Sequence, residues 1–119
     1  LDIDQFDGAA LRGMLDSAFF AAMKPTAYFI NTGRGPVVNE PDLIAALEAD
    51  EIAGAGLDVF EPEEPLPADS PFRSLDNAII SAHSAANTLD ARATQLRISV
   101  DNIEAFLNGK PTNIVTEDA

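Results

Sequence analysis

Short apolar segments alternate with amphipathic ones along this chain, and this alternation constrains the fold more than any other feature. Segments with the composition of buried strands lie at residues 27–30 (AYFI), 53–60 (AGAGLDVF) and 77–81 (NAIIS). The clearest helical pattern, NEPDLIAALEAD, stands between the first two. A strand, a helix and a second strand in this order predict a right-handed crossover and a parallel sheet. We therefore expect an open α/β sheet whose strands are covered on both faces.

Local signals mark the helices beside these strands. Asn39 can cap the helix in NEPDLIAALEAD, and Pro41 falls in its first turn, where no backbone donor is missed. Glu40 suits the positive end of the same helix. A shorter helix is predicted in DSAFFAAMKP, with Asp16 as its cap and Pro25 forcing its end.

The longest helical pattern covers residues 89–107 and carries a sustained apolar seam. The members of the seam alternate by four and three positions: Leu89, Ala93, Leu96, Val100, Ile103 and Leu107. Gly109 and Pro111 end the pattern. The pattern favours packing of the seam on the sheet of its own chain, and the alternative is pairing with a second subunit or another domain. At the other end of the chain, LDIDQF at residues 1–6 can form a short strand.

The chain is strongly acidic, and its charge limits its partners. Its 119 residues are one domain's worth, and 20 acidic against 7 basic residues give a net charge of −13. This argues against nucleic acid and anionic membranes as partners, and no apolar run approaches the roughly 20 residues that span a bilayer. The lack of cysteine excludes disulfides and thiolate metal sites, and we expect no metal. An anionic substrate would need a local positive group.

Polar or charged constellations accompany all three predicted strands. They are INTGRG with Arg34, DVFEPEEPLP with Glu61, Glu63 and Glu64, and SAHSAANT with His83, the only histidine. Ligands of open α/β sheets bind beyond the carboxyl ends of the strands. Gly33 and Gly35 would let the backbone turn tightly enough to aim Arg34 into a crevice there.

Each of these residues also has an ordinary structural explanation. Arg34 can be a surface arginine, at least two of the three glutamates can belong to a solvated acidic loop, and His83 can be a hydrogen-bonded structural histidine. Their coincidence at successive strand ends favours one shared site. There a guanidinium can bind a carboxylate through two hydrogen bonds, a histidine can move a proton, and a neighbouring carboxylate can stabilise the protonated ring.

The stretch from MKPTAYFINTGRG to SAHSAANT resembles the D-isomer-specific 2-hydroxyacid dehydrogenases, and the likeness covers about Asp16 to Leu107. Its motifs NTGRG, EEPLP and SAHSA are specific in combination. The resemblance implies a Rossmann-type open parallel sheet with flanking helices and three catalytic residues. Arg34 would bind the carboxylate and carbonyl of a 2-oxo acid. His83 would be the general acid for ketone reduction and the base for alcohol oxidation, with Glu64 as its carboxylate partner.

The same resemblance implies a nicotinamide cofactor at this edge of the sheet. Asp58, in GLDVF, would contact the nicotinamide carboxamide, and Thr32 and Gly33 would line the nicotinamide side of the cleft beside Arg34 and His83. No Gly-x-Gly-x-x-Gly occurs anywhere in the sequence, so no acidic ribose-binding residue can be placed relative to one. The choice between NAD and NADP therefore stays open.

Together these features predict the second half of a nucleotide-binding domain. Residues 1–108 would be a partial NAD(P)-binding domain and 109–119 a tail left from the substrate domain. The opening LDIDQFDG, without a signal peptide or an initiator methionine, fits processing or a start within a longer protein.

That longer protein would be a cytoplasmic homodimer that transfers a hydride between NAD(P)(H) and a D-2-hydroxy acid/2-oxo acid pair. We expect the 119-residue chain alone to be inactive. The alternative is a non-catalytic folded fragment or interaction module that associates through the helix at 89–107.

Overall fold

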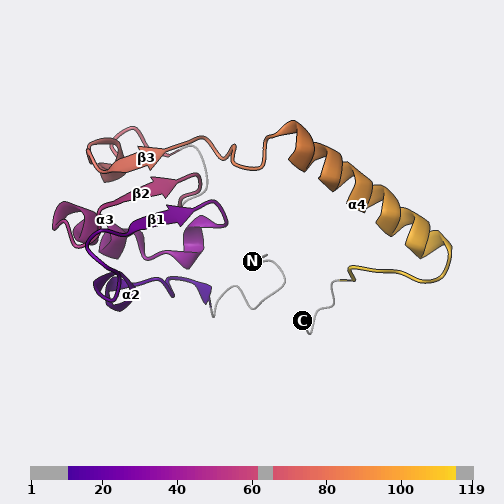
Figure 1. Cartoon of the computed structure of the whole chain (residues 1–119), viewed down its shortest axis with the longest axis horizontal. Coiled ribbons are helices and arrows are strands. Elements are labelled where there is room, and N and C mark those ends of the chain that lie inside the picture. Colours follow the sequence, from indigo (N-terminus) through magenta and orange to yellow (C-terminus); the bar gives the residue numbers. More distant parts are fainter. Residues whose placement is uncertain (1–10, 62–65, 115–119) are drawn as a thin grey trace. The chain divides into compact units, whose positions relative to one another are not determined.

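The computed structural model describes residues 11–61 and 66–114, and the chain divides into two compact units, Leu1–His83 and Ser84–Ala119. Figure 1 shows the elements of both units along the chain. The first unit contains α2 (Ser17–Ala21), β1 (Tyr28–Asn31), the 3₁₀ helix η2 (Gly35–Val37), α3 (Glu40–Glu48), β2 (Gly54–Leu57), the 3₁₀ helix η3 (Pro71–Arg73) and β3 (Ala78–Ile80). The second unit contains α4 (Leu89–Leu107).

The three strands form one parallel sheet in the order β1-β2-β3. The register pairs Ile30 with Gly56, and Gly56 with Ile79. Because α3 connects two parallel neighbours, the predicted strand–helix–strand arrangement is confirmed, and so is the α/β fold class.

β2 is shorter than the sequence predicts. It ends at Leu57 instead of continuing to residue 60. β1 already ends at Asn31, whose carbonyl accepts the backbone N–H of Asp58 at 2.9 Å, so the residues beyond have no strand beside them. The end of β2 is therefore set by the length of its neighbour.

The caps of α2 and α3 are confirmed. The Asp16 carboxylate accepts the backbone N–H of Phe19 at 3.1 Å, and Asn39 Oδ1 accepts that of Asp42 at 3.3 Å. Both bonds satisfy amide groups that the first turn of a helix leaves without partners. α2 ends at Ala21, before Pro25 is reached.

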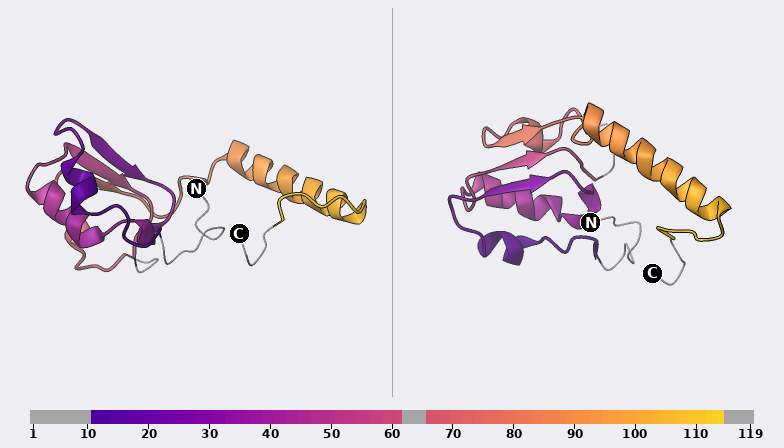
Figure 2. Two further views of the ribbon diagram at one scale, coloured as in Figure 1. Left: turned by 90° about the horizontal axis from the view of Figure 1, so that it is seen from below. Right: turned by 45° about the vertical axis from the view of Figure 1, so that its right-hand side comes forward.

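α2 and α3 cover one face of the sheet (Figure 2). The core between them is a single cluster of buried side chains: Phe20, Phe29, Val38, Leu43, Ala46, Leu47, Ile52, Ala55, Leu57, Phe60 and Phe72. Phe20 of α2 meets Phe29 of β1 edge to face, with ring centroids 5.4 Å apart. This face matches the sequence prediction of apolar strands under amphipathic helices.

Within the described residues of the first unit, no element covers the opposite face of the sheet. Tyr28, Ile30 and Ile79 are 69%, 64% and 78% exposed. The prediction that the strands are covered on both faces is therefore confirmed for one face within the first unit, and for the other face it stays a prediction. Side chains alternate across a strand, and the described helices of the first unit pack on one side only.

Two glycines of β2 form the floor of this open face. A Cβ added to Gly54 would lie 2.6 Å from the Asn77 carbonyl oxygen and 3.2 Å from the Tyr28 ring, and one added to Gly56 would lie 2.9 Å from Ile30 Cδ1. The two β1 side chains thus occupy the space over β2 that larger residues would fill.

α4, taken by itself, matches the predicted range of 89–107. Thr88 Oγ1 accepts the backbone N–H of Ala91 at 3.1 Å, and Gly109 adopts a left-handed conformation (φ +69°) beyond the helix end. None of its residues is buried. The seam is exposed at Leu89, Leu96, Val100, Ile103 and Leu107. What covers this seam stays a prediction.

Other predictions are not tested by these elements. The strand predicted at residues 1–6 lies outside the described residues. The predicted domain boundary after residue 108 concerns a longer protein and stays a prediction, whereas the compact units divide after His83. Within the described parts of the chain, no helix is long and apolar enough to cross a membrane.

Candidate active site

The turn that carries Arg34 is held by the side chain of the last β1 residue. Asn31 Oδ1 accepts the backbone N–H of Gly33 at 3.1 Å, and Asn31 Nδ2 donates to the Arg34 carbonyl at 3.0 Å. This is the local pairing by which asparagine closes turns. Arg34 itself is half-buried, and its Nη1 donates to the Gly33 carbonyl at 3.0 Å. This role of Asn31 was not predicted from the sequence, although an asparagine at a strand end is a turn signal.

At Gly35 this turn packs closely against the backbone of the chain that follows β2. A Cβ at position 35 would lie 2.1 Å from both the carbonyl carbon and the carbonyl oxygen of Phe60. No side chain fits there without moving backbone. Gly33 is different, because the nearest atom to an added Cβ is Asn31 Oδ1 at 3.6 Å. The tight turn predicted from both glycines therefore depends on Gly35 alone.

Asp58 joins the ends of β2 and β3. It is only 3% exposed, and its carboxylate accepts the Ser81 Oγ–H at 2.5 Å. Its backbone carbonyl accepts the N–H of His83 at 3.1 Å. Asp58 thus fixes the path of the chain between β3 and His83.

His83 is exposed and has a left-handed backbone (φ +49°). This conformation is uncommon for residues other than glycine, and where it occurs it is often part of a functional site. The bond to Asp58 holds the residue in this conformation. An exposed imidazole on a fixed backbone suits proton exchange with a bound molecule.

The structure brings most predicted site residues to one edge of the sheet. Because the strands are parallel, Thr32, Gly33 and Arg34 after β1, Asp58 after β2 and His83 after β3 all follow carboxyl ends. Glu64 lies outside the described residues. The roles assigned to these residues stay predictions.

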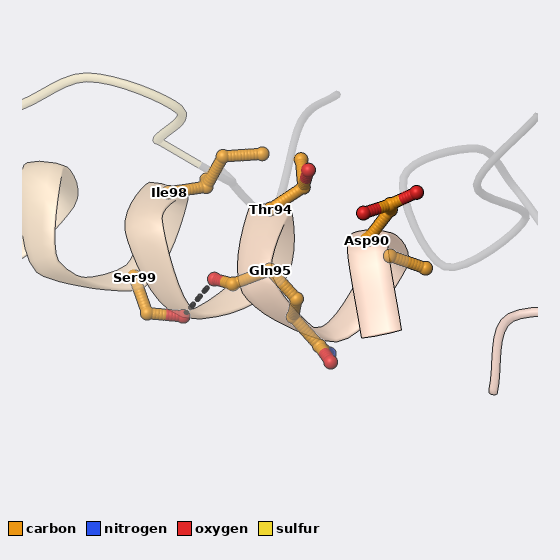
Figure 3. Close-up of a pocket in the computed structure, with 6 residues that line it drawn as sticks. Asp90, Thr94, Gln95, Ile98 and Ser99 are labelled. Carbon is orange, nitrogen blue, oxygen red and sulfur yellow. Dashed lines mark hydrogen bonds between the residues drawn. The ribbon is translucent and has the colours of Figure 1, made fainter. Parts of the chain in front are cut away.

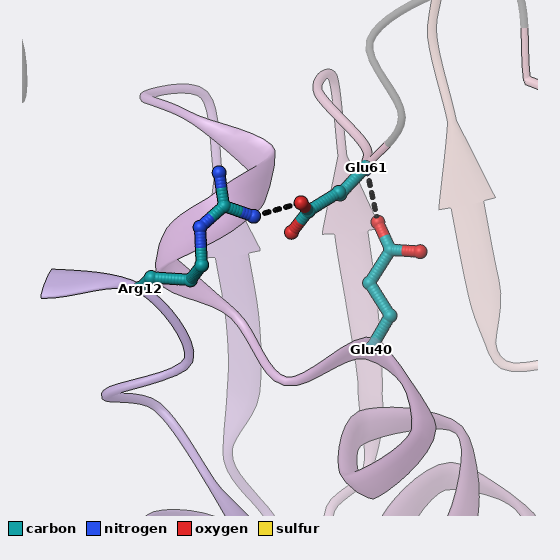
Figure 4. Close-up of polar contacts among 3 residues, drawn as sticks. All are labelled: Arg12, Glu40 and Glu61. Atoms are coloured by element: carbon teal, nitrogen blue, oxygen red, sulfur yellow. Dashed lines mark hydrogen bonds and ion pairs between the residues drawn. The ribbon is translucent and has the colours of Figure 1, made fainter. Parts of the chain in front are cut away.

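A charged cluster at the same edge was not predicted (Figure 4). Glu40 Oε1 accepts the backbone N–H of Glu61 at 2.7 Å, and the Arg12 guanidinium forms an ion pair with the Glu61 carboxylate. Burial raises the pKa of the Glu40 carboxyl from its usual 4.5 to about 7. From the sequence, Glu40 was assigned only to the positive end of its helix. No local pattern indicates its contact with Glu61.

The apolar surroundings of Glu40 explain its pKa. Glu40 lines a narrow, partly open gap, too small for a water molecule, with Asn31, Gly35, Val38, Leu43, Leu57, Val59 and Phe72. Five of these seven neighbours are apolar side chains that cannot solvate a charge.

A separate open depression runs along α4 (Figure 3). It is lined by Asp90, Ala91, Thr94, Gln95, Ile98 and Ser99. Ser99 Oγ donates to the Gln95 carbonyl at 2.9 Å within the helix. It contains none of the predicted site residues.

Comparison with known proteins identifies the family. The family model of the D-isomer specific 2-hydroxyacid dehydrogenase NAD binding domain matches residues 8–85. Glyoxylate/hydroxypyruvate reductase B of Citrobacter koseri is 50% identical over 97 residues, which cover 82% of this chain and 30% of the relative. The chain thus spans about a third of the length of the curated relatives it matches.

Solved structures agree with this assignment. A D-isomer specific 2-hydroxyacid dehydrogenase from Xanthobacter autotrophicus Py2, in complex with NADPH and MES, is 39% identical with a TM-score of 0.74, over 91% of this chain and 43% of that one. D-lactate dehydrogenase from Lactobacillus jensenii with NAD+ is 32% identical with a TM-score of 0.72, over 92% and 36%. The parallel sheet, the strand-end motifs and these matches agree: the chain belongs to the D-isomer-specific 2-hydroxyacid dehydrogenase family, through its NAD-binding domain.

Proposed function

We propose that this chain serves an oxidoreductase that transfers a hydride between NAD(P)(H) and a D-2-hydroxy acid/2-oxo acid pair. The observation that carries the proposal is the common strand edge, where Arg34 and His83 follow parallel strands on either side of β2. Asn31 and Gly35 fix the first turn and Asp58 fixes the second. Two such fixed groups can hold and protonate one small molecule.

Arg34 is the proposed substrate anchor. A guanidinium pairs with a carboxylate through two parallel hydrogen bonds, which also orient the acid. In a chain of net charge −13, this local positive group offsets the repulsion of an anionic substrate. Glyoxylate and hydroxypyruvate are the first candidates, because the Citrobacter relative is named for their reduction.

His83 is the proposed acid and base, with Glu64 as its partner. Reduction of a ketone leaves negative charge on its oxygen, and a protonated imidazole can give that oxygen its proton. In the oxidation direction the neutral ring takes the proton back. A carboxylate beside the ring favours its protonated form, which is the role proposed for Glu64.

The described residues fit the nicotinamide end of a dinucleotide. Thr32 and Gly33 are exposed at the end of β1, and Asp58 adds a carboxylate already oriented by Ser81. When bound, NAD or NADP supplies or accepts the hydride. The proposal includes no residues for the pyrophosphate, because the sequence has no Gly-x-Gly-x-x-Gly. NAD and NADP stay alternatives.

The remaining proposals concern assembly and location. We propose a homodimer of the longer protein in the cytoplasm, and the lack of cysteine fits that compartment. The second candidate function is association of a non-catalytic module through α4. The exposed apolar seam of that helix favours it.

A hybrid enzyme tests the proposed activity. The 97 residues of the Citrobacter koseri reductase that match this chain would be replaced by the residues of this chain. We expect reduction of glyoxylate or hydroxypyruvate with NADH or NADPH, followed by cofactor absorbance. A hybrid that is folded by circular dichroism and binds cofactor, yet turns over neither acid, would contradict the proposal.

Substitutions in the hybrid separate the two roles. His83→Gln should lower turnover by about 10²–10⁴-fold, because glutamine has no proton to give near neutral pH. Arg34→Ala should mainly raise the KM for the 2-oxo acid.

Glu64→Gln should move the pH optimum of ketone reduction to lower pH, because protonated His83 loses the carboxylate that stabilises it. Arg97→Ala, on exposed α4, is the control. Near-normal turnover of His83→Gln would reject the assigned acid.

A further inference from the structure

Three hydrogen bonds fasten the chain after β3 to the end of β2, its neighbour in the sheet (Figure 1). The backbone N–H of Ser81 donates to the Leu57 carbonyl at 2.9 Å, and Ser81 Oγ donates to the Asp58 carboxylate at 2.5 Å. The backbone N–H of His83 donates to the Asp58 carbonyl at 3.1 Å. Ser81 therefore binds the side chain of Asp58, and His83 binds its backbone.

The Asp58 carboxylate depends on hydrogen-bond donors. Asp58 is only 3% exposed, and its backbone N–H donates to the Asn31 carbonyl at 2.9 Å, which fixes its place beside β1. An ionised carboxylate can only accept hydrogen bonds, and burying it without enough donors is costly. The Ser81 hydroxyl is such a donor, and a hydrogen bond to a charged acceptor is stronger than one between neutral groups. The hydroxyl group thus favours one orientation of the carboxylate.

The backbone of His83 depends on the same attachment. Its φ of +49° is uncommon for a residue with a side chain, and such conformations persist where the surrounding contacts hold them. Ser81 precedes His83 by two residues, so the hydroxyl bond and the His83 N–H bond close a short turn on Asp58. Loss of the hydroxyl bond should loosen this turn.

We propose that Ser81 is a positioning residue: its hydroxyl group fixes the orientation of the Asp58 carboxylate, which receives the nicotinamide end of the cofactor, and steadies the turn that carries His83. This inference rests on the function proposed above, in which Asp58 contacts the nicotinamide carboxamide. A carboxamide has N–H donors, and a carboxylate accepts them well only in a suitable direction. In this role Ser81 acts through Asp58 and His83.

The Arg34 turn is fastened by a different side chain. Asn31 Oδ1 accepts the backbone N–H of Gly33, and Asn31 Nδ2 donates to the Arg34 carbonyl. Ser81 follows β3, on the other side of β2. A change at Ser81 should therefore weaken binding of the cofactor more than binding of the 2-oxo acid, whose proposed anchor is Arg34. General destabilisation would instead lower the amount of active enzyme and leave both affinities unchanged.

Amide hydrogen exchange of the 119-residue chain, followed by nuclear magnetic resonance, tests the attachment without cofactor or catalysis. In Ser81→Ala the His83 amide should exchange about tenfold faster, because the turn opens more often once Asp58 is loosened. Ser81→Thr keeps the hydroxyl group at an exposed position, so its rate should stay near that of the original chain. Ser99→Ala is the control, because the Ser99 hydroxyl bonds within α4.

A third variant at the same position grades the strength of the donor. Ser81→Cys keeps the shape of the side chain, but a thiol is only a weak donor. The exchange rate of its His83 amide should lie between those of the original chain and Ser81→Ala. This variant decides the question if Ser81→Ala does not fold. A His83 amide that exchanges alike in Ser81→Cys and Ser81→Thr contradicts the attachment.

The hybrid enzyme tests the consequence for the site. In Ser81→Ala the dissociation constant for NADH or NADPH should rise about tenfold. It is measured without the 2-oxo acid, from the fluorescence of the reduced nicotinamide. The KM for the 2-oxo acid should stay within about twofold of the original, because Arg34 keeps its turn. Ser81→Thr should restore the affinity for the cofactor.

The two proposals fail separately. A hybrid that binds cofactor but turns over neither acid, and in which Ser81→Ala weakens that binding, rejects the proposed function and supports the role of Ser81. An active hybrid with the same cofactor affinity in Ser81→Ala and Ser81→Thr rejects the positioning role.

Discussion

The two faces of the small sheet carry the same kinds of residue in opposite surroundings. Phe29 and Leu57 are buried under α2 and α3, whereas Tyr28, Ile30 and Ile79 are more than 60% exposed. Apolar strand residues occur on both faces, so the residue type does not tell them apart. The difference shows that the same side chain contributes to stability only where another element covers it.

At the carboxyl edge of the sheet, two glycines show the same contrast between a covered and an open position. Gly35 lies against the Phe60 backbone, whereas Gly33 has free space where a side chain would be. One glycine is required by packing and the other is not. Three sets of substitutions test whether filled and open positions differ in their contribution to stability.

The largest effect is expected between the faces themselves. Phe20→Ala, in the covered core, should lower the free energy of unfolding by about 3–5 kcal/mol, because it leaves a cavity among the aromatic rings. Ile79→Ala, on the open face, should change it by less than about 0.5 kcal/mol. Urea denaturation of the 119-residue chain measures both. Equal losses would mean that Ile79 is covered in solution.

The second effect is expected between the glycines. Gly35→Ala should cost about 1–3 kcal/mol, because a methyl group 2.1 Å from the Phe60 carbonyl forces backbone to move. Gly33→Ala should be within about 0.5 kcal/mol of the original. Thermal unfolding of the two variants provides the comparison. If both are equally destabilised, the close approach of Gly35 does not decide the turn.

The smallest effect concerns the half-buried Glu40. Because its pKa is about 7 in the folded chain and near 4.5 when unfolded, its favourable contribution is complete below pH 4.5 and is lost as pH rises through about 7. When the pH is raised from 5 to 8, the free energy of unfolding of Glu40→Gln should therefore fall by less than that of the original chain. Urea midpoints at both pH values, with Glu48→Gln as control, measure the difference. Parallel losses in both chains would contradict the raised pKa.

Local signals made part of the fold predictable from the sequence. Asp16 and Asn39 were identifiable as caps because a cap bonds within its own first turn. The range of α4 followed from its spacing and from the terminating Gly109. The order of the parallel strands followed from the alternation of elements, which also placed Arg34 and His83 at one edge.

Features that depend on distant segments were not predictable. β2 ends at Leu57 because β1 ends at Asn31, and no local pattern records the length of a neighbour. The open face depends on what covers it. Glu40 is desolvated by residues such as Leu57 and Phe72, which are near it only after folding.

Tyr28 gives the open face a spectroscopic label of its own. It is the only tyrosine in a sequence without tryptophan, and it lies over Gly54 with 69% of its surface exposed. Tyrosine fluorescence of the unmodified chain, excited at a wavelength that phenylalanine does not absorb, therefore comes from one known position on that face. Acrylamide quenching of this emission reports, without any introduced dye, whether another polypeptide shields the sheet.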